Sequence, residues 1–379
     1  MFSVIGAHML ACKEPFYPSD VKGNPGFLVV DGFIDAGTDS SFIRLTRTAS
    51  LSDSNVIAEL RATVFVSDLS GRIFPLPEIG NGYYATDHLD LTQGKYYKLN
   101  IQSSDGRSYI SDSFPVLNSP SIDSLSWTQD SVGVSVYAYT HDPGNLTKYY
   151  RWDYVETWRY DEGLESVFDW NGTDIYLRPP DEQIYSCWGT HKSTSLILAT
   201  TENLATDTIN HQLIAEIPVN SEKISVRYSI QVHQYALTKS AFEYWQNLKA
   251  NTELTGSLFD PMPSQVTGNL HCVSTPSELV LGYIGASTVA SQRIFVNRTE
   301  LDSWYYKPFW IDCVQPGAYR ISIDPHDPAN IPRINDYLLG PDHLYTLVDV
   351  TPSGVLILAP NYCADCRVHG GTNQPPSFW

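Results

Sequence analysis

Basic residues are scarce in this chain of 379 residues, which has 24 Lys and Arg against 42 Asp and Glu and a formal net charge of -18 at pH 7. This excess of negative charge opposes binding to phosphate backbones and to anionic lipid surfaces. Nucleic acid is therefore excluded as the main partner. Long apolar runs are also missing, since no stretch reaches the ~18 to 20 consecutive apolar residues that a membrane-spanning helix needs.

Common catalytic motifs are absent as well. The sequence contains no GxSxG elbow for a nucleophilic serine, no HExxH zinc motif, and neither of the glycine-rich phosphate loops, GxxxxGK[ST] and GxGxxG. The ten histidines are scattered singly, without the spacing of metal ligands. We therefore expect no enzyme activity, no cofactor and no metal site.

Aromatic and turn-forming residues are abundant instead. There are 24 Tyr, 9 Trp and 14 Phe, together with 24 Gly and 24 Pro, while only 17% of residues are charged. This mixture favours strands and turns over long charged helices. With 42% hydrophobic residues, the chain can build the cores of two to three domains.

Short alternating segments predict a mainly β protein of two domains. Residues 26–118 carry five to seven such segments, including a hairpin around Asp105-Gly106, which predicts an immunoglobulin-like or fibronectin type III-like β-sandwich. Residues 119–379 predict a second, larger β-sandwich-like domain with an insertion over 159–192 and one or two short helices. The helix is expected at about 238–253, because Thr238 can cap it and Ala241, Trp245 and Leu248 form one apolar stripe.

Aromatic residues gather on the strand expected over 149–158 and in the insertion. Exposed aromatic faces serve sugar or peptide binding, because they bury a large area at low entropic cost. The alternative interpretation is a sandwich core covered by the insertion. The candidate contacts with a ligand or partner are Trp152, Trp158, Trp170, Tyr176, Tyr185 and Trp188.

Carboxylates near these aromatics suggest a second possibility. Glu156, Asp161, Glu162 and Glu165 would support glycoside hydrolysis if two of them lay about 5 to 10 Å apart in a cleft. Among 42 acidic residues such proximity in sequence is expected by chance. A glycan-active enzyme therefore stays an alternative that the separation of the carboxylates would decide, and we assign no catalytic residue.

The amino terminus resembles the end of a lipoprotein signal peptide. MFSVIGAHML is apolar and leads into Ala11 and Cys12, a small residue followed by the cysteine that would be acylated. Residues 1–11 are then a signal-peptide remnant whose basic region would lie upstream of Met1. Residues 12–25 are polar and rich in Pro and Gly, and they predict a lipidated tether.

Five cysteines remain after Cys12, so at least one of them has no partner within the chain. Cys363 and Cys366 have CxxC spacing, but the second pair of ligands that a zinc site requires is missing. We expect one of these two to form a disulfide with a distant cysteine such as Cys313. Cys187 and Cys272 are interpreted as small buried apolar residues.

Several segments spread over the chain are long and specific. They are CKEPF at 12–16, FLVVDGFI at 27–34, YYRWDYVETW at 149–158, RYSIQVHQYALTKSAFEYWQNLKANTE at 227–253, GSLFDPMPSQVTGNL at 256–270, and the ending CADCRVHGGTNQPPSFW. In these segments the chain resembles the domain of unknown function 4249 family of Bacteroidota outer-membrane lipoproteins. The resemblance implies a gene beside a TonB-dependent outer-membrane receptor and a role in nutrient capture. It supplies no catalytic residues.

These observations together predict a lipid-anchored protein of the outer membrane, displayed at the cell surface through Cys12. Its expected role is to assist a TonB-dependent β-barrel receptor and to bind the cargo, which is an oligosaccharide or a peptide. The alternatives are a structural or assembly subunit of an outer-membrane complex without a small ligand, and the glycan-active enzyme.

Overall fold

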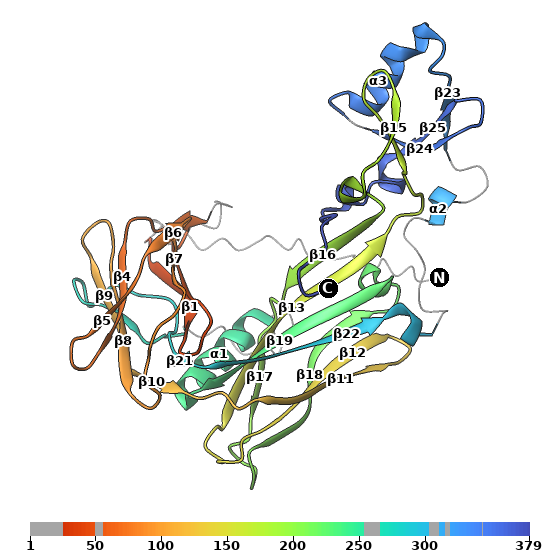
Figure 1. The fold of residues 1–379 in the computed structure, drawn as a ribbon. Helices are drawn as coiled ribbons and strands as arrows, with labels where there is room; N and C mark the ends of the chain where they lie inside the picture. The colour runs from red at the N-terminus through yellow and green to blue at the C-terminus, as the bar shows by residue number, and fades with distance from the viewer. Residues whose placement is uncertain (1–25, 50–55, 254–265, 303–310, 315–318, 343) are drawn as a thin grey trace, which may run out of the picture.

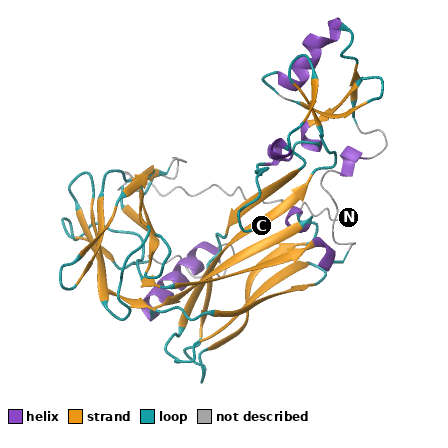
Figure 2. Cartoon of the chain, viewed as in Figure 1, coloured by secondary structure: helices purple, strands orange, loops and turns teal. Residues whose placement is uncertain are grey.

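The computed structural model describes residues 26–49, 56–253, 266–302, 311–314, 319–342 and 344–379. Strands dominate the described chain, and helices are few and short (Figure 2). This confirms the predicted mainly β class. None of the described helices is long and apolar enough to cross a membrane. The expected signal-peptide remnant, the tether and Cys12 lie outside the described residues.

The N-terminal unit is a single sheet of twelve strands wrapped around one core (Figure 1). Alternation builds this core, since β8 directs Tyr97, Leu99 and Ile101 inward and leaves the intervening residues outside. The predicted hairpin is formed by β8 and β9, with Gly106 in the turn at a φ of 87°. The strands are β1 (Leu28–Asp35), β2 (Ser41–Arg47), β3 (Ile57–Ala58), β4 (Thr63–Asp68), β5 (Ile73–Leu76), β6 (Glu78–Gly80), β7 (Tyr83–Thr86), β8 (Tyr96–Gln102), β9 (Ser108–Ser111), β10 (Phe114–Leu117), β20 (Leu270–Cys272) and β21 (Ala286–Ser287).

Two of these strands come from far along the chain. β21 lies between β1 and β10 and pairs with both of them in parallel, while β20 extends the sheet beside β9. The N-terminal unit is therefore discontinuous, whereas the sequence predicted one continuous segment over 26–118. Strands of two and three residues are too short to produce a recognisable alternation, so the sequence carries no sign of this return.

The central unit is a sandwich of two antiparallel sheets with one core between them. Even-numbered residues of β13 point into this core, including Tyr150 and Trp152. Thr238 caps the predicted helix α1, because its Oγ1 accepts a hydrogen bond from the Ala241 backbone at 3.2 Å. The elements are β11 (Ile122–Gln129), β12 (Gly133–His141) and β18 (Thr208–Pro218) in one sheet; β16 (Ser186–Lys192), β13 (Tyr149–Asp161), β19 (Arg227–Leu237), β22 (Val289–Asn297) and β17 (Ile197–Thr200) in the other; and α1 (Lys239–Glu253).

A C-terminal unit has a core of its own and projects from the central sandwich (Figure 1). The sequence predicted one domain over 119–379, and the structure instead builds two cores there. The insertion contributes to the second core, because Trp170 packs with residues of the last strands. The elements are β14 (Phe168–Trp170), β15 (Ile175–Leu177), α2 (Ile311–Val314), β23 (Ile321–Ile323), α3 (Ile331–Leu339), β24 (Tyr345–Val350) and β25 (Leu356–Pro360).

Buried hydrogen bonds fix the N-terminal unit to the central unit. Ser119, in the segment between β10 and β11, donates to the Thr288 carbonyl at 2.6 Å and accepts from the Ala236 backbone at 2.8 Å. The Gln234 side chain donates to the Pro120 carbonyl at 2.8 Å. The junction is therefore a defined interface, and segments from both units line the cavities along it.

Candidate functional site

The six aromatic residues singled out in the sequence do not share one surface. Trp152 is 1% exposed and donates its indole N–H to Gln234 at 2.9 Å inside the central core. Trp170 is 2% exposed and donates to Asn335 at 2.6 Å in the C-terminal unit. Trp188 is buried beside Trp379. These three rings belong to the packing of the protein, as the core interpretation holds.

The remaining three candidates are partly accessible but lie apart. Trp158 is half-buried against the central core, with Lys223 Nζ 5.2 Å from the centre of its ring. Tyr185 is half-buried at the base of the insertion. Tyr176 is 38% exposed on β15 and lines a cavity of about 570 Å³ in the C-terminal unit, together with Trp170. No common aromatic platform results from these positions.

Two of the carboxylates considered for the alternative enzyme, Glu156 and Glu162, are buried. Glu156 is 2% exposed and accepts hydrogen bonds from Tyr228 at 3.0 Å, Lys223 at 2.5 Å and His191 at 2.9 Å. None of the four cavities described in this section is lined by Glu156. These three hydrogen bonds give Glu156 a role in the stability of the central sandwich.

Glu162 lies deeper still. Its side chain is fully buried, and burial raises its pKa to about 8, with a further increase from the nearby carboxylates of Glu222 and Asp365. His369 Nε2 lies 3.4 Å from Glu162 Oε1. Among the described residues, no group of three or more His, Cys, Asp or Glu is arranged to hold a metal ion.

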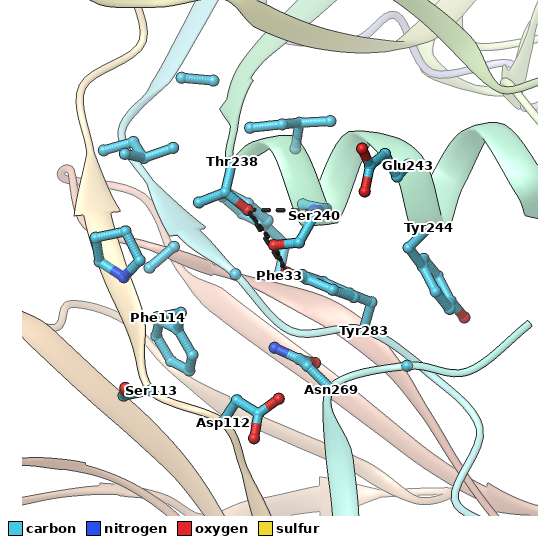
Figure 3. Close-up of a pocket in the computed structure, with 18 of the residues that line it drawn as sticks. Phe33, Asp112, Ser113, Phe114, Thr238, Ser240, Glu243, Tyr244, Asn269 and Tyr283 are labelled. Atoms are coloured by element: carbon cyan, nitrogen blue, oxygen red, sulfur yellow. Dashed lines mark hydrogen bonds between the residues drawn. The ribbon is translucent and has the colours of Figure 1, made fainter.

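Three cavities lie where the N-terminal and central units meet, with volumes of about 400, 390 and 450 Å³. Ligand sites occur preferentially at such domain interfaces. We call the cavity of about 400 Å³ the junction pocket (Figure 3). It is lined by aromatic rings, hydroxyl groups, amides and carboxylates.

Five separate segments build the junction pocket, one of which is 266–269. β1 supplies Phe33, the segment 112–117 supplies Asp112 and Phe114, α1 supplies the opposite wall, and the segment before β21 supplies Tyr283 (Figure 3). On α1 the residues that face the pocket are spaced i, i+3, i+4 and i+7, which places them on one side of the helix: Ser240, Glu243, Tyr244 and Asn247.

Hydrogen bonds hold the polar wall of the junction pocket in place. The Tyr283 hydroxyl lies 2.8 Å from Ser240 Oγ and 3.5 Å from Thr238 Oγ1 (Figure 3). The Asn269 side chain is buried and bonds both the backbone N–H and the carbonyl of Ile284 at 2.8 Å. These contacts preorganise the rings, which lowers the entropic cost of binding.

The charged side chains that line the junction pocket are acidic. In the described part of the chain its charged lining residues are Asp112 and Glu243, without any Lys or Arg. His271, outside the lining, lies 3.0 Å from Asp112 through Nε2. Burial, and then the charge of Asp31, raises the pKa of Tyr244, so this ring stays a neutral phenol at physiological pH.

The cysteines form two disulfides and one free thiol among the described residues. Cys313 pairs with Cys363, and Cys187 pairs with Cys366. Cys272 is a buried free thiol. The interpretation of Cys187 as a simple buried apolar residue is therefore wrong. Its bridge joins β16 to a residue 179 positions away, and no local pattern in the sequence indicates that pairing.

The family model described as "Domain of unknown function (DUF4249)" matches residues 13–293, which is more than half of the chain. The chain belongs to the DUF4249 family. The match includes both walls of the junction pocket and ends before the C-terminal unit's last strands. No curated protein matches the chain.

Solved structures resemble this DUF4249 protein only weakly. The chicken interferon gamma receptor alpha chain is 11% identical, with 56% of this chain and 91% of that chain covered and a TM-score of 0.18. The chicken CNTN1 FN1-FN3 domains are 11% identical over 56% and 64% of the two chains, with a TM-score of 0.21. Trypsin-activated alpha-2-macroglobulin from Escherichia coli is 11% identical over 59% and 15%, with a TM-score of 0.20.

The residues of the junction pocket were not among the candidates from the sequence. The polar and aromatic face of α1, beside the apolar stripe, was visible in the sequence and was the one local sign of a site. The other walls come from short segments far apart in the chain, and only the fold brings them together.

Proposed function

We propose that this DUF4249 protein is a ligand-binding lipoprotein of the outer membrane that delivers cargo to a TonB-dependent receptor. The observation that supports the binding role is the junction pocket, an open cavity of about 400 Å³ with preorganised rings and hydroxyl groups between two units whose junction is hydrogen-bonded. Its volume suits a group of the size of a monosaccharide or an amino-acid side chain.

Membrane attachment follows from the sequence before the first unit. Ala11 and Cys12 end an apolar run, and the polar segment to residue 25 supplies a tether. The net charge of -18 opposes an electrostatic attachment to anionic lipids, so acyl chains on Cys12 and contacts with a protein partner provide the attachment.

The binding role is favoured over the two alternatives by the pocket itself. An assembly subunit without a small ligand would have its aromatic groups covered by protein and no open cavity, whereas Tyr244 and Tyr283 border one. A glycan-active enzyme needs a carboxylic acid of raised pKa in its cleft. Glu162 has a raised pKa but lines none of the four cavities described above. Glu243 and Asp112, the carboxylates that line this pocket, are both exposed.

Membrane fractionation tests the anchoring part of this proposal. We expect the protein in the outer-membrane fraction of its native cells, accessible to protease added to intact cells, with a mature N-terminal peptide heavier by the mass of acyl chains on Cys12. The Cys12→Ala variant should accumulate without this modification and leave the membrane. An unmodified Cys12 in the wild-type protein would contradict the lipid anchor.

A further inference from the structure

The charge of the junction pocket restricts what it can bind. Carboxylates of Asp112 and Glu243 line it, and among the described residues its lining holds no Lys, Arg or His to balance a phosphate or a carboxylate of a ligand. An anion entering the pocket would approach two negative charges on a protein whose net charge is already -18. A cation would instead gain attraction from both walls.

The aromatic rings of the pocket also attract cations. Tyr244 and Tyr283 lie with their ring centroids 5.2 Å apart and tilted by 38°, and Phe33 forms part of the same lining. The negative face of an aromatic ring attracts ammonium and guanidinium groups within about 6 Å of its centroid. Both the rings and the carboxylates of the pocket therefore favour a cationic ligand.

A cationic side chain of the protein itself, Arg151, packs against aromatic rings next to Phe33. The guanidinium of Arg151 lies 4.6 Å from the Tyr235 ring centroid, 4.9 Å from Trp245 and 6.0 Å from Phe33. Phe33 lines both the junction pocket and the adjoining cavity that holds Arg151. The aromatic side chains of this junction therefore already hold a guanidinium on one side, while the junction pocket offers a similar environment without a resident cation among its lining residues.

From these observations we infer that the junction pocket binds the cationic side chain of a peptide, an arginine or a lysine, between Tyr244, Tyr283 and the carboxylates of Glu243 and Asp112. This inference rests on the proposed binding function and assigns its ligand class. The Ser240 and Tyr283 hydroxyls supply acceptors for the N–H groups of such a side chain.

Calorimetric titration of the purified protein with capped tripeptides tests the inference. The probes are acetyl-Gly-Arg-Gly-amide and its citrulline analogue, which has nearly the same shape and no charge. At pH 8 we expect the arginine peptide to bind at least tenfold more tightly than the citrulline peptide, and less tightly as salt is raised. Equal affinity for the two peptides, or tighter binding of a glutamate or oligosaccharide probe, would overturn the inference.

Variants locate the binding in the pocket. Glu243→Gln and Asp112→Asn should each weaken arginine binding about two- to fivefold and leave citrulline binding unchanged, as expected for partly solvated charges. The exposed Glu165, in the C-terminal unit, gives the matched control, since Glu165→Gln removes the same charge and should change nothing. If Glu165→Gln weakens binding as much as Glu243→Gln, the effect is that of net charge and the inference fails.

A steric variant separates this inference from the proposed function. Gly285 lines the pocket, and a Cβ there would meet none of the described atoms within 4 Å, so Gly285→Leu places its side chain in the open space of the pocket. We expect it to abolish binding of the arginine peptide. If it instead abolishes binding of an oligosaccharide, the pocket is a binding site as proposed but its ligand is not cationic; if it leaves arginine binding intact, the inference is wrong.

Discussion

Removal of the Cys187–Cys366 disulfide should destabilise the central and C-terminal units together. This bridge joins β16 to η7 (Cys366–His369), residues 179 positions apart in the chain, and both sulfur-bearing side chains are buried beside Tyr160. Closing a loop of that length removes conformational entropy from the unfolded chain worth about 5 kcal/mol, by the chain-entropy relation at 25 °C. The 50-residue separation of Cys313 and Cys363 corresponds to about 4 kcal/mol.

Tryptophan fluorescence provides a selective assay for this effect. All nine tryptophans lie after residue 118 and outside 266–288, so the N-terminal unit contributes none. Guanidinium chloride titrations of the wild type and of Cys187→Ala/Cys366→Ala, both without reductant, should differ by several kcal/mol in the free energy of unfolding. Cys272→Ala removes the free thiol of the N-terminal unit and serves as the control, with an unchanged tryptophan transition.

Peptide mapping without reductant decides the pairing. We expect one crosslinked peptide pair with Cys187 and Cys366, a second with Cys313 and Cys363, and alkylation of Cys272 alone. A Cys313–Cys366 link, a crosslinked Cys272, or a double variant within about 0.5 kcal/mol of the wild type would refute the reasoning, since each contradicts a closed long loop.

Further predictions concern a buried acid and a close glycine contact. Burial raises the pKa of Glu162 to about 8 in the folded protein, against 4.5 in the unfolded chain. The contribution of Glu162 to the free energy of unfolding is therefore full below pH 4.5 and is lost as the pH rises toward 8. Glu162→Gln should therefore raise the melting temperature at pH 8.5 but not at pH 4, whereas the exposed Glu165→Gln should do neither; equal shifts at both pH values would contradict the buried acid. A Cβ on Gly189 would lie 2.5 Å from the Trp158 ring, so Gly189→Ala should cost about 1–3 kcal/mol in a denaturation titration, while Gly285→Ala in open space should cost little.

Local patterns in the sequence sufficed for much of the fold. Alternation predicted the strand at 149–158, and in β13 it does place Tyr150 and Trp152 in the core. The helix at 239–253 followed from an apolar stripe and a capping threonine. These features depend on neighbours within a few residues, which is why sequence alone predicts them.

Long-range pairings were out of reach for the same reason. β20 and β21 are two or three residues long and return to a sheet whose other strands end at residue 117. Cys187 carries no local sign of its distant partner. The junction pocket depends on both the return of β21 and the docking of α1, so its residues became candidates only when the fold placed Phe33, Tyr244 and Tyr283 together.

The central claim is that this protein captures a ligand for a TonB-dependent receptor, and isolation of the native complex tests it most directly. Outer membranes of the native cells are solubilised in mild detergent, the protein is immunoprecipitated, and its partners are quantified by mass spectrometry. The account predicts that a TonB-dependent β-barrel receptor co-purifies in near-stoichiometric amount with the wild type and with Gly285→Leu, whose pocket is filled but whose surface is unchanged. Recovery of the lipidated protein without any such receptor would contradict it.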